Sequence, residues 1–521
     1  MANKKEINKS DVKLNLLGLT TEEKTELNEI KEDYMFYFGA FTKEQVKEYK
    51  DKTDKSQLGQ SWFIDDKLDY VPSQVVDNIT QELIKKQARF FLGREPNLLF
   101  KLKDKKIGTD NKEEKEKLEQ FRMFIDEILE NNSFWPDMLK NFKLASITRR
   151  ILVRLEANEG EPIKIHSHDV CDFSYSLDSQ GDLNRLRLVS YLGYDEEEED
   201  HMFARYTYYL ESNVDGSDVR CMMLTEEFYS SDTINPIGGK QDPVRTIYTR
   251  IPAVLFFNER DLFNPTGISD IQQLKGLQNQ YNRRFSDFAD ALRFNMFGST
   301  SIIDGDPEDV NNITVAPGSI IAVGTENTAK DSNKQAQIKI IESNFSNAEP
   351  VEKFLEMIRN SMGDKLAIPR KDALKEIPSA KALKFIYNDL IARCDEKWKD
   401  WEPGIFKLIK LIIESCDKLN CYDDFDKSFL NLDYSMILKK NYPIPDDEED
   451  AKRLAMEEVQ ANVRSHRSYI KDYGSDEDYE ELFKEVIEDN QRINESTMDP
   501  ISRVLADEQN SSNELVEPSQ E

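Results

Sequence analysis

The chain has 521 residues, of which 33% are charged, and its formal net charge at pH 7 is −30. This length allows roughly two to four domains. Such acidity argues against a conventional nucleic-acid-binding protein, because these are usually basic overall. It is typical of a solvated surface, although an acidic wall also repels phosphates and would let a duplex slide past.

The N-terminal region is highly charged and only weakly apolar, apart from Tyr34–Phe41. We expect an arm over 1–60 that is partly disordered alone and that wraps a neighbouring subunit. Its first residues lack the apolar segment of a secretory signal peptide. The longest uncharged apolar runs, such as 253–257, are far too short to span a bilayer, so we expect no membrane segment.

Apolar residues at helical spacing predict an amphipathic helix over 73–93, with Gly93 at its C-terminal cap. A strand over 97–103 follows. A second helix, charged on one side, is predicted over 113–145.

From 148 to 257 the pattern changes to alternating polar and apolar residues, and Gly, Asn and Asp separate the runs. This pattern predicts an antiparallel β domain.

A long helix is predicted over 269–296, where Ser269 and Gln272 form a capping box and one polar residue, Gln278, interrupts an apolar stripe. At 1.5 Å per residue it is roughly 40 Å long. A returning helix is predicted over 346–362, and the segment between them alternates like short strands and turns. A helical hairpin cannot bury both of its faces alone, so a ring of identical hairpins would supply its neighbours.

The C-terminal part begins with a long helix over 379–416 that Pro403 and Gly404 are expected to kink. A strand is predicted near 427–440 and two or three acidic helices over 446–493. The tail over 494–521 is rich in Ser, Asn, Glu and Gln, and we expect it to be disordered.

One cluster has the residue types of a metal site: His166 and His168, followed by Asp169, Cys171 and Asp172. Two His residues two apart in a strand share a face, which a metal could use. No further ligand set of standard spacing accompanies them, so a polar strand end is the favoured interpretation. We expect no metal and no cofactor.

Other motifs are weaker still. The run Gly238-Gly239-Lys240 lacks the upstream Gly and the Ser or Thr of a phosphate loop, and a turn is favoured. The acidic run Asp195–Asp200 is interpreted as a solvated hairpin tip. The five Cys residues form no CxxC pair, which predicts free thiols in a reducing compartment.

Basic side chains stand out in this acidic chain at two places. Arg370, Lys371 and Lys375 lie in a loop between two Pro residues, where an ordinary surface turn and a functional loop both stay open. The second set belongs to the first long helix and comprises Arg283, Arg284 and Arg293. These three face DNA or pair with Asp287 and Asp290 of a neighbouring helix, and pairing is the favoured alternative.

Three blocks resemble the portal proteins of tailed bacteriophages, most closely the SPP1-type family. The run 251–292 (IPAVLFFNERDLFNPTGISDIQQLKGLQNQYNRRFSDFADAL) is similar to the entry into the portal stem. The run 378–401 (PSAKALKFIYNDLIARCDEKWKDW) is similar to the helix after the tunnel loop. The run 463–482 (VRSHRSYIKDYGSDEDYEEL) is similar to the C-terminal segment. Their order and spacing match over about residues 75–490.

The resemblance implies an α+β portal fold with a β-rich wing, a two-helix stem, a small β clip, a long kinked spine helix and an α-helical crown. The implied parts are an arm over 1–60, a wing over 61–267, stem helices over 268–296 and 346–364, a clip over 297–345, a tunnel loop over 365–378, a spine with wing closure over 379–442, a crown over 443–493 and a disordered tail over 494–521.

The resemblance also implies a function without covalent chemistry. Twelve copies would form a ring at one vertex of the virion capsid and conduct double-stranded DNA during packaging and ejection. Arg370, Lys371 and Lys375 would then contact phosphates in the channel. The implied partners are the terminase large subunit, a head–tail adaptor, the major capsid protein and the scaffold, with assembly in the host cytoplasm.

Two functions from other classes remain as alternatives at this point. One is an acidic oligomeric scaffold or chaperone-like ring that binds basic proteins and has no DNA role. The other is a hydrolase whose site forms no recognisable motif.

Overall fold

The computed structural model describes residues 9–39, 73, 75–103, 112–212, 219–296, 299–311, 323–326, 335–341, 348–370, 380–444 and 448–461, with single residues and short pieces between 463 and 487. The chain divides into two compact units. One comprises 1–375 and 386–443, and the other comprises 376–385 and 444–521. The content is mixed α and β, as expected for an α+β protein.

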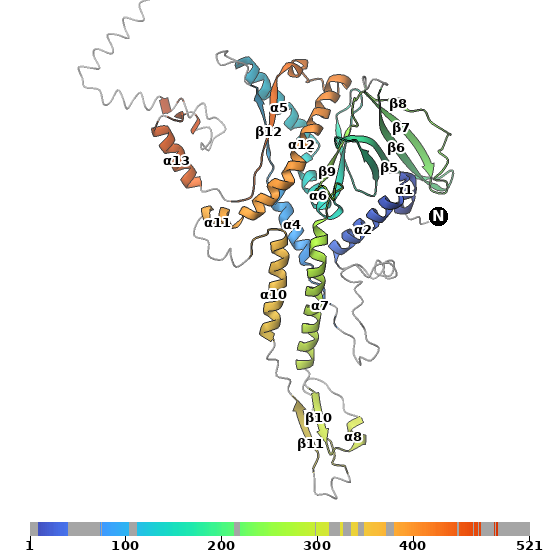
Figure 1. The fold of residues 1–521 in the computed structure, drawn as a ribbon, viewed down its shortest axis with the longest axis vertical. Coiled ribbons are helices and arrows are strands. Elements are labelled where there is room, and N and C mark those ends of the chain that lie inside the picture. The colour runs from blue at the N-terminus through green and yellow to red at the C-terminus, as the bar shows by residue number, and fades with distance from the viewer. Residues whose placement is uncertain are drawn as a thin grey trace, which may run out of the picture. The chain divides into compact units, whose positions relative to one another are not determined.

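The N-terminal region forms two helices, α1 (Lys9–Leu17) and α2 (Thr21–Phe38), within 9–39 (Figure 1). Leu16 and Leu17 are buried against Val189, Phe203 and Phe228 of the chain's own sheet. A capping box of Thr20 and Glu23 starts α2. Within the expected arm, 9–39 is therefore helical, because apolar residues such as Leu16, Leu17 and Phe36 are buried within the same chain.

Helices α4 (Ile79–Leu92), α5 (Lys112–Asn131) and α6 (Phe134–Thr148) follow. The predicted start of α4 at 73 is wrong, since Asn78 caps the helix by accepting from the Gln81 amide. The single helix predicted over 113–145 is two helices, because Ser133 adopts a left-handed conformation with φ of 49°. Strand β1 (Asn97–Leu102) confirms the strand predicted after α4.

The β domain predicted over 148–257 is confirmed and contains two antiparallel sheets. One has the order β3-β2-β9 and the other β4-β5-β6-β7-β8. Their strands are β2 (Arg150–Glu156), β3 (Lys164–His168), β4 (Phe173–Leu177), β5 (Leu183–Asp195), β6 (Asp200–Glu211), β7 (Arg220–Tyr229), β8 (Val244–Arg245) and β9 (Ala253–Phe257). The acidic run Asp195–Asp200 is the hairpin tip between β5 and β6, as predicted.

Helix α7 (Asp270–Met296) confirms the first long helix of the predicted hairpin, and α10 (Ala348–Lys365) is the returning helix. Between them lie β10 (Ser299–Ile303), α8 (Pro307–Asn311) and β11 (Gln337–Ile341). The two strands pair antiparallel, so the chain that leaves α7 returns to α10 through a β ladder. The capping residue expected for the return helix, Ser346, lies outside the described residues.

The long C-terminal helix is interrupted near its start: α11 (Ala380–Ile386) is followed by α12 (Asn388–Leu419). Helix α12 continues through Pro403, and Gly404 lets it approach β9 closely. A Cβ atom at Gly404 would lie 2.8 Å from the ring of Phe256. A short 3-10 helix η2 (Lys427–Asn431) and strand β12 (Tyr434–Lys439) come next, and β12 pairs with β1.

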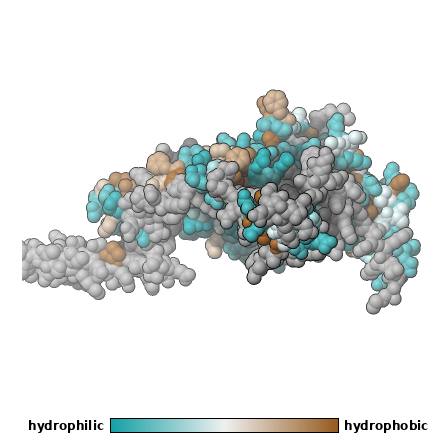
Figure 2. All heavy atoms as spheres, turned by 90° about the horizontal axis from the view of Figure 1, so that it is seen from below, coloured by the Kyte–Doolittle hydropathy of each residue, from teal (hydrophilic) through white to brown (hydrophobic). Residues whose placement is uncertain are grey.

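The second unit contains helix α13 (Glu448–Gln460), in which Ala455 and Val459 are buried. It confirms the first of the predicted acidic helices, and most of 461–521 lies outside the described residues. On the face seen in Figure 2, hydrophobic residues are scattered among hydrophilic ones rather than gathered in one large patch. In the described ranges, no helix is long and apolar enough to span a membrane.

Candidate functional site

The hairpin of α7 and α10 is held together by an apolar seam along its length. Leu274, Tyr281, Leu355, Ile358 and Met362 are buried in one cluster, and the two helices lie side by side (Figure 1). Ser269 starts α7 by accepting a hydrogen bond from the Ile271 amide to its Oγ atom. The seam buries one face of each helix, and the other faces need contacts elsewhere.

A row of buried polar side chains runs along a second face of α7 at four-residue steps: Gln278, Asn282, Ser286 and Asp290. Each accepts a backbone N–H from the segment that precedes or begins α4. The donors are the amides of Thr80 to Gln278 at 2.9 Å, Asp77 to Asn282 at 3.2 Å, Val75 to Ser286 at 2.9 Å and Ser73 to Asp290 at 3.0 Å.

The geometry explains why this row fits an extended segment. From Ser73 to Asp77 the donors are two residues apart, and two residues of extended chain advance about 6.6 Å. Four helical residues advance about 6.0 Å, so these three donors meet successive acceptors, and Thr80 in the first turn of α4 meets the fourth. Gln278 also donates to the Asp77 carbonyl oxygen at 2.7 Å and to Asn282 Oδ1 at 2.9 Å, which uses both N–H groups of its amide. The amides of Ser73, Val75, Asp77 and Thr80 are thereby held along the helix. The Thr80 hydroxyl, which donates to Gln278, and the Asp77 carboxylate, which accepts from Tyr281, add side-chain contacts.

A buried ion network holds the first turn of α7 against α12. Asp270 is 1% exposed, and its carboxylate lies 2.8 Å from Lys397 Nζ and 2.9 Å from Arg393 Nη2. Asn258 donates to Asp270 and accepts from Lys397, which closes the ring of contacts. Burial alone would raise the pKa of Asp270, but the charges of Lys397 and Arg393 outweigh it and lower that pKa. The network ties the helical hairpin to the β9 end and to α12.

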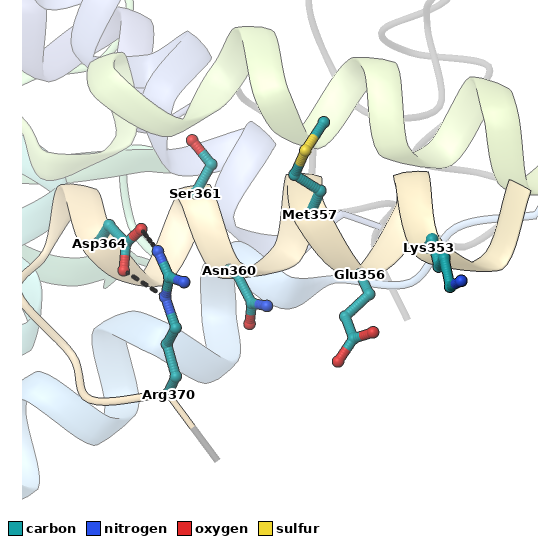
Figure 3. A pocket seen from close by; sticks show the side chains of 7 residues that line it. All are labelled: Lys353, Glu356, Met357, Asn360, Ser361, Asp364 and Arg370. Atoms are coloured by element: carbon teal, nitrogen blue, oxygen red, sulfur yellow. Dashed lines mark hydrogen bonds and ion pairs between the residues drawn. The ribbon is translucent and has the colours of Figure 1, made fainter. Parts of the chain in front are cut away.

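The basic loop begins directly after α10. Its first basic residue, Arg370, forms a bidentate pair with Asp364, at 2.5 Å and 3.1 Å (Figure 3). Both side chains are about half exposed, and a hydrogen bond to Asp364 together with its charge raises the pKa of Arg370. The charge of Arg370 is therefore balanced within the chain. Lys371 and Lys375 lie outside the described residues.

The three arginines of α7 are all exposed, but the pairing predicted for them needs a correction. Arg284 pairs with Asp287 of its own helix at 3.1 Å. Asp290 is only 8% exposed and accepts the Ser73 amide, so it does not offer a carboxylate to a neighbour. Asp290 is thus taken by the amide of Ser73, which is remote in sequence, while pairing of these arginines with Asp287 of a neighbouring helix stays a prediction.

Two hollows lie on the hairpin. One, of about 450 Å³, lies between the helices and is lined by Phe288, Ala291, Val351 and Phe354 with the Arg284–Asp287 pair. The other, of about 260 Å³, lies along α10 and is lined by Lys353, Glu356, Met357, Asn360 and Asp364 among others (Figure 3). Neither has the convergent buried polar groups of a catalytic pocket.

The predicted His cluster lies at and just after the end of a strand. His168 ends β3, and burial together with the charge of nearby Arg154 lowers its pKa to about 4. Burial raises the pKa of Cys171 to about 11, so its thiol stays protonated. No group of three or more potential ligands occurs in the described part of the chain. The favoured interpretation as a polar strand end agrees with this geometry.

The remaining motifs behave as predicted. Gly238 and Gly239 both have positive φ, 76° and 81°, and form a turn before β8. All five Cys residues are free, and four of them are buried.

Sequence reasoning missed the polar row on α7 and the ion network. The four-residue spacing of Gln278, Asn282, Ser286 and Asp290 was a visible signal, because polar residues that repeat with the helical period must share a face. Nothing in the sequence indicated that Asp270 and Lys397, more than a hundred residues apart, would meet.

The comparisons with known proteins give one match that spans most of the chain. Residues 18–496 match the family model described as phage portal protein, SPP1 Gp6-like. No curated protein matches the chain.

Proposed function

The chain belongs to the SPP1 Gp6-like family of phage portal proteins, and from this premise we propose that twelve copies form a ring at one vertex of a phage capsid. The ring surrounds an axial channel through which double-stranded DNA is packaged and later ejected. Proteins of this family are structural components of the virion capsid. We extend this to the chain itself, which performs no covalent chemistry.

The family match over residues 18–496 carries this proposal. The hairpin supports it, because α7 and α10 bury one seam against each other and expose charged residues on the sides that point away from it. Identical hairpins standing around an axis would cover those sides. The alternatives of an acidic scaffold and of a hydrolase have no comparable observation in their favour.

The proposed parts keep the bounds expected from the sequence. The arm covers 1–60, the wing 61–267, the stem helices 268–296 and 346–364, the clip 297–345, the tunnel loop 365–378, the spine 379–442, the crown 443–493 and the tail 494–521. The wing then corresponds to the region of the two antiparallel sheets and the stem to α7 and α10.

DNA contact in the proposed channel comes from the tunnel loop. Arg370, Lys371 and Lys375 from twelve copies form a cationic collar that touches phosphates, so binding is independent of sequence. Because Asp364 already balances Arg370, a phosphate has to compete with that carboxylate. The contact is therefore weak, which suits a duplex that must move. The remaining acidic surface repels the duplex and keeps it from sticking.

The proposed docking surfaces follow from the order of the parts. The clip, at the turn of the hairpin, binds the terminase large subunit during packaging and the head–tail adaptor afterwards. The wing faces the major capsid protein and the scaffold, and assembly takes place in the host cytoplasm.

Negative-stain imaging of the purified chain tests the proposal. A ring of twelve or thirteen subunits with an axial hole is the expected result, and a monomer with metal-dependent hydrolytic activity would contradict it.

Two functional tests address the proposed parts. Alanine in place of Arg370, Lys371 and Lys375 together should lower the amount of DNA packaged or retained per particle. Full packaging with normal retention would contradict the proposed cationic collar. Deletion of 297–345 should leave ring formation possible and abolish terminase binding, and a deletion that still bound terminase would refute the role of the clip.

A further inference from the structure

The two helices of the hairpin present different charged stripes on the sides that face away from each other. On α10, residues at steps of three or four place the outer stripe opposite the apolar seam: Glu349, Lys353, Glu356, Asn360 and Asp364. On α7, the corresponding outer stripe comprises Gly276, Gln280, Arg283 and Asp287. All of these residues except Asn360 are exposed in the single chain.

The level of each residue along the hairpin follows from contacts within the chain. Phe288 of α7 lines one hollow with Val351 and Phe354 of α10, so these residues lie at one level. Nearer the start of α7, Tyr281 of α7 and Arg359 of α10 both contact Asp77, so these two residues lie at a second common level. The helices run antiparallel, and each advances 1.5 Å per residue.

Counting from these two levels places the members of the stripes opposite one another. Asp287 is level with Lys353, and Arg283 is level with Glu356 to within one residue. Gln280 is likewise level with Asn360, and Gly276 with Asp364. Rotation about an axis parallel to the hairpin keeps every residue at its own level.

We propose that the outer stripe of α7 binds the outer stripe of α10 in the next copy of this chain, with Arg283 paired to Glu356 and Asp287 paired to Lys353. The partner is a second copy because each stripe carries the opposite charge of the other at the same level. The two stripes lie on different sides of the hairpin, so they cannot pair within one chain. The inference rests on the proposed ring and names the contact that closes it.

The charges are available for this contact. Within the described residues, neither Arg283 nor Glu356 has an ion-pair partner of its own. Asp287 is held by Arg284 and Lys353 by Glu349, but both pairs are more than half exposed. Exposed pairs of this kind contribute little to stability, so a change of partner costs little.

The uncharged positions fit as well. Gln280 and Asn360 each carry an amide that can both donate and accept, so they can bond to each other. A Cβ atom at Gly276 would meet no atom within 4 Å. Since a glycine inside a helix is unfavourable relative to alanine, the space left by Gly276 on the outer stripe is explained by the close approach of the neighbour's Asp364.

A charge exchange tests the pairing. Arg283→Glu should place two carboxylates together and raise the protein concentration needed for ring assembly by roughly two- to fivefold or more. Glu356→Arg alone should do the same, and the double variant with both changes should return assembly to the wild-type concentration. The mismatched double variant, Arg283→Glu with Lys353→Asp, is the control and should remain impaired. Sedimentation velocity measures the assembled fraction.

A covalent test does not depend on charge. Gln280→Cys combined with Asn360→Cys should give a ladder of disulfide-linked multimers on oxidation. Gln272→Cys with Asn360→Cys should give none, because Gln272 is also exposed but lies roughly 12 Å further along α7. The native cysteines contribute no ladder if each single variant stays monomeric on the gel, since four of the five are buried.

The outcomes distinguish a failure of this pairing from a failure of the proposed ring. Rings without cross-links, and without rescue by the charge exchange, would overturn this pairing and leave the proposed ring standing. A wild-type chain that forms no ring would overturn the proposed function and this inference together. Cross-links formed only with another protein would show that the stripes serve a different partner.

Discussion

Asp270→Asn should destabilise the folded chain strongly, because it removes one charge from a buried network and keeps the shape of the side chain. Lys397, only 2% exposed, would lose the carboxylate at 2.8 Å and keep the Asn258 oxygen at 2.7 Å. Arg393 would lose a contact at 2.9 Å and keep Glu259 at 3.1 Å. Two cations would then share one site without their main counter-ion.

The size of the effect follows from the distance. At 2.8 Å and an effective dielectric constant of about 20, the attraction between Asp270 and Lys397 is about 6 kcal/mol. Removing Asp270 also recovers the cost of burying its charge, so the net loss is smaller. Breaking one side of a buried pair typically costs about 3–5 kcal/mol, and we expect a loss in that range.

Urea denaturation followed by tryptophan fluorescence measures this loss. Trp398 and Trp401 lie on α12 beside the network and are fully buried, so their emission reports the unfolding of this region. Wild type and variant must be compared at one protein concentration, since assembly would add to the stability of both.

Asp137→Asn is the matched control. Asp137 pairs with Lys140 at the same 2.8 Å, but the two side chains are 44% and 74% exposed. The same chemical change at Asp137 should lower the free energy of unfolding by at most about 1 kcal/mol. Equal effects of the two substitutions, or a loss below about 1 kcal/mol for Asp270→Asn, would refute the reasoning from burial. Adding Lys397→Met to Asp270→Asn should recover part of the loss, because the unpaired buried charge is then gone.

Three further outcomes follow from single contacts, all measured by urea denaturation. Gln278→Leu leaves the buried amide of Thr80 without an acceptor and should cost about 1–3 kcal/mol, and a neutral result would mean that water or another group takes its place. Because burial and Arg154 lower the pKa of His168 to about 4, the folded state keeps it neutral. Below pH 6.5 the unfolded chain binds a proton at His168 and the folded chain does not, so the free energy of unfolding should fall by up to about 3 kcal/mol between pH 6.5 and 4. A His168→Asn variant with the same pH slope as wild type would contradict this. Gly404→Ala should destabilise by about 1–3 kcal/mol because its Cβ atom would press on Phe256, whereas a gain in stability would show that the ring moves aside.

The sequence by itself determined the elements whose pattern is local. The apolar stripe of α7, the alternation across the β domain and the returning helix α10 each depend on a repeat of two or of 3.6 residues, which neighbouring residues display directly. The order of three blocks also indicated the portal family, which the match over residues 18–496 shows. Where a break depends on one residue, such as left-handed Ser133, the same patterns predicted one helix in place of two.

Only the tertiary structure decided which polar groups are buried and which groups they bond to. Asp290 was expected to face a neighbour and instead holds the amide of Ser73, and Asp270 meets Lys397 across 127 positions of sequence. Helices α1 and α2 fold onto their own chain because Leu16 and Leu17 find an apolar cluster made by three distant strands. Such contacts depend on where segments remote in sequence come to lie, and a buried polar group needs a partner wherever that partner sits in the chain.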